Sequence, residues 1–156
     1  MTKNQEIQRL KDLYKKEHGL KEIDMPSFIK WVVAKGYPLP DPPTAEELLA
    51  KQFVRALKEE TRKDPETGES YRVNYAFSTD SKGNGVFWVD IDEAPRKHIL
   101  KVVIQRREQM VADAVQLDFI QEHWNKKNPE EEPINVPFDF TDDVLWRKNS
   151  RDEGAA

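Results

Sequence analysis

The apolar positions in the first third of the chain recur every three or four residues, which is the spacing of amphipathic helices. The first predicted helix runs from about Asn4 to His18 and carries its apolar side chains at Ile7, Leu10, Leu13 and Tyr14. A second helix begins at Asp24, a residue type that caps helices, and has Pro26 in its first turn, where proline is tolerated.

A third helix is predicted for residues 44–62. It opens on Thr44-Ala45-Glu46-Glu47, a capping box in which the threonine hydroxyl and the Glu47 carboxylate satisfy free amides. One side of this helix gathers apolar residues such as Leu49 and Phe53. The opposite side gathers four basic residues within about 60° of one another, at 100° per residue: Lys51, Arg55, Lys58 and Arg62.

A period of two replaces the helical spacing at residues 71–78. Apolar Tyr71, Val73, Tyr75 and Phe77 alternate with smaller or polar residues, which predicts a half-buried strand. Residues 79–85 have the composition of a loop, and Val86 to Ile91 can form the returning strand. The pattern therefore predicts one β-hairpin.

The second half of the chain begins with a long predicted helix, residues 93–127. Its apolar residues recur every seven positions: Val103, Met110, Leu117 and Trp124. From residue 128 onward the chain is rich in proline and acid, so residues 128–156 are predicted to form an extended, partly disordered acidic tail. Alternating apolar residues from Ile134 to Phe140 would let that piece dock as an edge strand, although it contains Pro137.

These elements predict an α+β, mostly helical fold. Residues 1–92 would form a three-helix, winged-helix-like unit with a β-hairpin. Residues 93–127 would pack on this unit or project from it, followed by the tail 128–156.

Composition narrows the class of protein. The 156 residues include no cysteine, which excludes disulfides, thiolate zinc sites and a cysteine nucleophile. Without a secretory signal or an apolar run of membrane-spanning length, we expect a cytoplasmic protein. The net charge of −4 is unevenly distributed. Residues 94–127 carry seven basic against four acidic side chains, whereas residues 128–156 carry three against eight.

Candidate chemistry is sparse. None of the three histidines stands in a metal-binding spacing, no nucleophile motif is present, and we expect no cofactor. Asp90, Asp92 and Glu93 end a strand and could hold Mg²⁺, as in a small metal-dependent nuclease. A simpler alternative is that Asp92 and Glu93 stabilise the start of the following helix. An enzyme is the weaker interpretation.

The basic helix face suggests binding instead. Lysines and arginines that neutralise phosphates release counterions and so drive affinity for nucleic acid. The candidate contacts are the four basic residues of helix 44–62 and three that follow: Lys51, Arg55, Lys58, Arg62, Lys63, Arg72 and Lys82. The alternative is an ordinary solvated helix face.

Two resemblances add to this picture. Residues 4–91 resemble a winged helix-turn-helix in the order of their elements, which implies that helix 44–62 is the recognition helix and 79–85 the wing tip. The second half is similar to a group of uncharacterised bacterial proteins. That likeness rests on Ala94-Pro95-Arg96, Gln105-Arg106-Arg107 and residues 138–144, and it implies a bacterial origin without an activity.

Three functions therefore compete. The first is a non-catalytic protein that binds duplex DNA as a regulator or accessory subunit of a nucleic-acid-processing complex. The second is an interaction or oligomerisation adaptor that binds another protein, or a second copy, through the long helix and tail 128–146. Its candidate contacts are Phe138, Phe140 and Trp146. The third is the metal-dependent nuclease.

Overall fold

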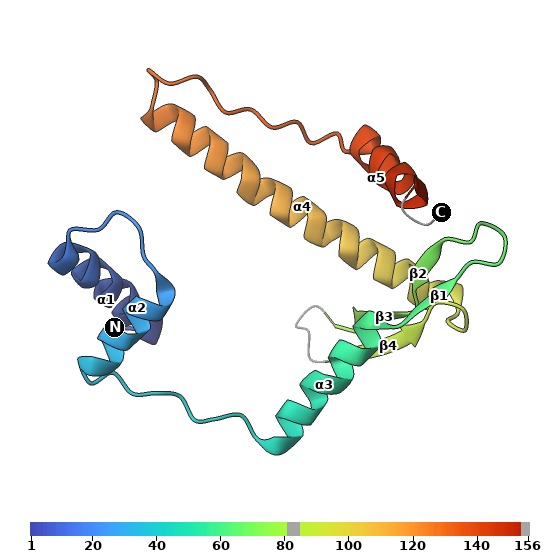
Figure 1. Cartoon of the computed structure of the whole chain (residues 1–156), viewed down its shortest axis with the longest axis horizontal. Coiled ribbons are helices and arrows are strands. Elements are labelled where there is room, and N and C mark those ends of the chain that lie inside the picture. Colours follow the sequence, from blue (N-terminus) through green and yellow to red (C-terminus); the bar gives the residue numbers. More distant parts are fainter. Residues whose placement is uncertain (81–84, 154–156) are drawn as a thin grey trace. The chain divides into compact units, whose positions relative to one another are not determined.

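The computed structural model describes residues 1–80 and 85–153, and it confirms the predicted α+β, mostly helical class (Figure 1). The elements assigned within these residues are, in order, α1 (Lys3–His18), α2 (Met25–Ala34), α3 (Ala45–Glu59), β1 (Thr61–Lys63), β2 (Ser70–Arg72), β3 (Asn74–Ser78), β4 (Val86–Asp90), α4 (Arg96–Lys127) and α5 (Thr141–Glu153). None of these helices is long and apolar enough to cross a membrane.

The chain divides into two compact units, Met1–Leu48 and Leu49–Ala156. In the first unit, α1 and α2 pack around buried Tyr14, Phe28 and Val32. Gly19 adopts a left-handed conformation (φ 63°) and ends α1, and the Asp24 carboxylate accepts from the Ser27 amide at the start of α2. Both helices are as predicted, whereas the grouping of the first three helices with the hairpin stays a prediction.

The third helix begins as predicted but ends early. Thr44 and Glu47 form the capping box, with the Thr44 amide 2.9 Å from Glu47 Oε2 and the Glu47 amide 3.2 Å from Thr44 Oγ1. The helix stops at Glu59, so the prediction that it reaches Arg62 is wrong. The reason is tertiary: the Asn74 side chain donates to the carbonyl of Leu57, and the next residues join a strand pair.

Two antiparallel hairpins replace the single predicted hairpin. The expected strand 71–78 is broken at Val73, so that β2 pairs with β1 while β3 pairs with β4. Val73 is fully buried. Its amide donates to the carbonyl of Glu60, and its carbonyl accepts from the amide of Ile91, so this one residue joins both hairpins.

Helix α4 packs against β3. Val102 and Phe77 are buried where they meet, and the His98 ring stacks on Phe77 with 4.9 Å between the ring centroids. The Gln105 amide then pairs with both backbone groups of Ser78, at 2.9 Å from its amide and 2.8 Å from its carbonyl. This end of α4 is fixed to the hairpin.

The chain after α4 differs from its prediction. Residues 128–131 form a turn, residues 132–140 pair with no strand among the described residues, and residues 141–153 form α5 instead of extended tail. Asp139, just before this helix, accepts from the amide and hydroxyl of Thr141, the first helical residue, and Asp142 and Asp143 suit the helix's positive end. The local capping signal thus outweighs the polar composition. The last residues of the predicted disordered end, 154–156, lie outside the described part.

Candidate interaction surface

The four basic residues predicted to share one helix face do not all lie on a helix. Lys51, Arg55 and Lys58 lie on α3, Arg62 and Lys63 on β1, and Arg72 on β2, while Lys82 lies outside the described residues.

Arg62 is not part of an open basic ridge, which corrects the sequence prediction. Its guanidinium makes a two-point contact with Asp90, at 2.7 and 3.1 Å, and also donates to Asp92. The hydrogen bonds to Asp90 and then to Asp92 raise the pKa of Arg62, and the Arg62 contact holds the pKa of Asp90 below its ordinary value. The guanidinium therefore makes contacts within the chain that connect β1 to the end of β4.

The three cations on α3 remain exposed. Arg55 donates to Glu59 at 2.8 Å, an exposed pair of the kind that contributes little to stability. Lys51 and Lys58 form no ion pair with the described part of the chain, and with Arg55 they border a shallow hollow. Arg72 donates to the carbonyl of Asn74 and covers the Tyr75 ring.

Asp90 and Asp92, two of the three acidic residues proposed as a metal site, are engaged within the chain. Arg62 binds Asp90 and Asp92, and the Tyr71 hydroxyl donates to Asp92 at 2.9 Å. Within residues 1–80 and 85–153, no group of three or more histidine, aspartate or glutamate side chains could hold a metal ion. A guanidinium thus occupies the position in which the nuclease hypothesis needs a cation.

After the turn at residues 128–131, segment 132–140 runs back along α4, where two amide side chains hold it (Figure 1). Asn125 accepts from the Ile134 amide at 2.9 Å and donates to the Ile134 carbonyl at 2.8 Å. One turn earlier, Gln121, which is 8% exposed, accepts from the amide of Val136 at 2.9 Å. These two residues replace the strand partner expected from the alternating pattern.

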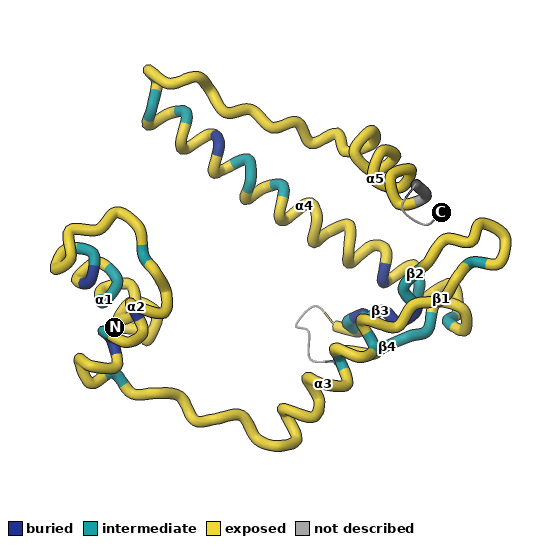
Figure 2. Tube along the Cα trace, viewed as in Figure 1, coloured by how far each residue is buried: buried dark blue, intermediate teal, exposed yellow. Residues whose placement is uncertain are grey.

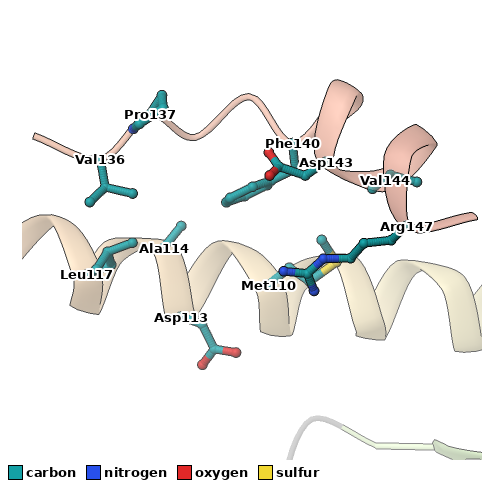
Figure 3. Close-up of a pocket in the computed structure, with 10 residues that line it drawn as sticks. All are labelled: Met110, Asp113, Ala114, Leu117, Val136, Pro137, Phe140, Asp143, Val144 and Arg147. Atoms are coloured by element: carbon teal, nitrogen blue, oxygen red, sulfur yellow. The ribbon is translucent and has the colours of Figure 1, made fainter. Parts of the chain in front are cut away.

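Beyond this clamp, α4 and the returning chain border an open groove of about 640 Å³. Figure 3 shows Val136 and Phe140 pointing from the returning chain towards α4, while Ala114 and Leu117 point back from the helix and Asp113 points away. The remaining lining residues are Met110, Pro137, Asp143, Val144 and Arg147.

A second groove of about 540 Å³ follows the other side of the same seam. Met110, Ala114 and Phe140 line both grooves. The second is completed by Arg107, Val111, Val115, Asp118, Phe119 and Phe138. Much of this lining is open to solvent: Met110 is 60% exposed, Phe119 58% and Phe140 42%. Figure 2 shows exposed residues along most of α4 and α5.

The three predicted partner contacts fall at different places. Phe138 lines the second groove and Phe140 lines both, whereas Trp146 on α5 lines neither and is 70% exposed. Sequence reasoning missed Gln121 and Asn125 as the residues that hold the segment. Their spacing of four residues on one helix, followed by an alternating extended segment, is the signal that was available.

Comparison of the chain with protein-family models, with curated proteins and with solved structures gave no match.

Proposed function

We propose that this protein is an interaction module that binds another polypeptide along the seam between α4 and the returning segment. The observation that carries the proposal is the pair of grooves whose apolar walls face each other without filling the space between them. Met110, common to both grooves, keeps 60% of its surface exposed. Contiguous exposed apolar surface of this kind marks interaction sites.

The chemistry of the grooves favours an apolar helix as the ligand. Gln121 and Asn125 already satisfy backbone groups of the returning segment, and the lining offers mainly aliphatic and aromatic carbon. An amphipathic helix inserts such side chains at spacings of three and four residues. Burial contributes roughly 25 cal/mol for each Å² of apolar surface removed from water, so a few anchors would suffice for a specific complex.

Two matched variants test the proposal. Met110→Asp places a charge inside both grooves, whereas Ile120→Asp places the same charge on an α4 residue that is 66% exposed and lines neither groove. A protein captured from the native host by the wild-type chain should be purified and titrated calorimetrically against all three. Binding that survives Ile120→Asp and is lost in Met110→Asp is expected. Equal binding by the wild-type chain and both variants would remove the proposal.

A second candidate is contact with nucleic acid through α3. It is favoured by the exposed Lys51, Arg55 and Lys58, which border one hollow. In a winged-helix arrangement α3 would be the recognition helix, and these cations would meet phosphates.

The test is the salt dependence of binding to a duplex DNA, measured by fluorescence anisotropy. Lys51→Glu with Lys58→Glu should lower affinity and reduce the slope of log K against log salt by about 2. Lys16→Glu with Lys21→Glu changes the charge equally on exposed residues of the first unit and serves as control. The same slope in both double variants would exclude this function.

A further inference from the structure

A stripe of aliphatic side chains runs along α4 beside the second groove. Its members are Leu100, Ile104, Val111 and Val115, which are 43%, 50%, 42% and 44% exposed. At 100° per residue they fall within about 60° of one another, on a different side from Val102, which is buried towards the hairpin. Because Val111 and Val115 also line the second groove, the stripe continues the proposed interaction surface towards the start of α4.

The charges of α4 are separated along its length. Its first part, residues 96–107, is exclusively basic among its charged residues: Arg96, Lys97, Lys101, Arg106 and Arg107. The following part, residues 108–122, is exclusively acidic: Glu108, Asp113, Asp118 and Glu122. Few of these charges are neutralised internally. Within the described residues, these charged side chains of α4 form one ion pair, Arg107–Glu108, at 3.4 Å between neighbouring exposed side chains.

The stripe has the same point of symmetry as the charges. Leu100 and Val115 are equally distant from the Arg107–Glu108 peptide, and so are Ile104 and Val111. That peptide is also where the basic part of the helix gives way to the acidic part. When two such helices lie antiparallel, the apolar residues of one therefore face those of the other, and opposite charges meet.

We propose that a second copy of this chain binds along the stripe, with the two α4 helices antiparallel about a two-fold axis near residues 107 and 108. This arrangement sets Leu100 against Val115 of the second copy and Ile104 against Val111. It also places each basic part beside an acidic part, whereas a parallel arrangement places like charges together. The inference rests on the proposed function and names its partner.

Charge exchange tests this geometry directly. Lys97→Glu with Lys101→Glu makes both halves of α4 acidic at the contact, and Asp118→Lys with Glu122→Lys makes both basic. Sedimentation equilibrium of the full chain should show a wild-type dimer, and each double variant should dissociate at least about tenfold more readily. An equimolar mixture of the two variants should recover a heterodimer, because opposite charges again face each other.

A mixture that stays monomeric, or a wild-type chain that is monomeric throughout the micromolar range, overturns the inference. Val111→Asp supplies an independent arm, since it places a charge in the stripe, and it is expected to give a monomer whose circular dichroism is unchanged. A dimer that survives Val111→Asp also overturns the proposed contact. If the wild-type chain is monomeric but still binds a host protein through Met110, the dimer inference fails and the proposed function stands. If the chain is a dimer and binds no host protein, the second copy is its sole partner.

Discussion

The guanidinium of Arg62 and the carboxylate of Asp90 meet at two points, with Nη2 2.7 Å from Oδ2 and Nη1 3.1 Å from Oδ1. The contact joins β1 to the end of β4, residues that are 28 positions apart in the chain. Arg62 also reaches Asp92, which accepts from the Tyr71 hydroxyl. A residue that would serve a binding surface on an open helix face instead ties the two hairpins together.

This contact predicts a dependence of stability on acid pH. The pKa of Asp90 is lower in the folded chain than in the unfolded chain, so its contribution is fully present above about pH 4 and is lost as pH falls through the lowered value. Arg62→Gln should reduce that loss. The measurement is urea unfolding of both chains from neutral pH to pH 2.

Two other carboxyl groups contribute to the same loss of stability in acid, so the wild type has to be compared with Arg62→Gln. Asp24 and Asp139 also have lowered pKa values, because each accepts hydrogen bonds from the start of a helix, and both titrate in the same direction. The difference between wild type and Arg62→Gln isolates the Asp90 contribution. Parallel stability curves for the two chains across this pH range would contradict the prediction.

Val73 should be the most sensitive aliphatic position of the second unit. It is fully buried, and its backbone bonds to Glu60 and Ile91 hold both hairpins in place. Val73→Ala keeps these bonds but leaves a cavity, and should lower the free energy of unfolding by about 1 to 3 kcal/mol. Val86→Ala, at a 57% exposed strand position, is the matched control and should change it little. Equal values in chemical denaturation would show that Val73 is not a core residue.

Gln105 should stabilise the fold through the two hydrogen bonds that its side-chain amide makes with Ser78. It accepts from the amide of Ser78 and donates to its carbonyl, which imitates the pairing of a further strand. Gln105→Glu keeps the acceptor but sets a carboxylate oxygen against the Ser78 carbonyl, and should lower stability by about 1 to 3 kcal/mol. Gln116→Glu, at an exposed position further along α4, is the control. Thermal unfolding should separate the two variants, and identical midpoints would argue against this pairing.

The amide clamp on the returning segment can be tested by hydrogen exchange. Gln121→Leu removes the acceptor for the Val136 amide, and Asn125→Ala removes the one for Ile134. Each substitution should speed exchange at its own amide by about tenfold, which corresponds to the loss of roughly one hydrogen bond's net free energy. Mass spectrometry of the peptide that covers residues 134–137 gives the measurement. Unchanged protection in both variants would mean that other contacts hold the segment.

The local signals in the sequence predicted the elements at the start of the chain. Thr44 with Glu47, Asp24 with Ser27, and Gly19 are capping residues whose partners lie within a few positions, so the ends they define do not depend on the rest of the fold. The same kind of signal at Asp139 and Thr141 specifies α5. The acidic composition of residues 128–156 predicts an extended tail instead, because composition does not reveal this local hydrogen bond.

What depends on distant residues could not be predicted in the same way. Helix periodicity carries on past Glu59, but Asn74 binds the last turn of α3 and Arg62 is drawn to Asp90, so the chain leaves the helix there. The alternation of residues 71–78 likewise hides the break at Val73, because the pattern of exposed and buried side chains is the same for one strand or two.

By itself, the sequence determined that the segments of α1 to α4 are helical, where most of these helices start, and that α4 is basic in its first part and acidic in its second. The tertiary structure alone decided that Arg62 binds Asp90 and Asp92. It also decided that Gln121 and Asn125 hold the returning segment beside open grooves. The physical reason is the distance along the sequence over which each kind of interaction acts. Capping and periodicity act within one or two turns, whereas these contacts join residues between 9 and 30 positions apart, whose meeting depends on the whole fold.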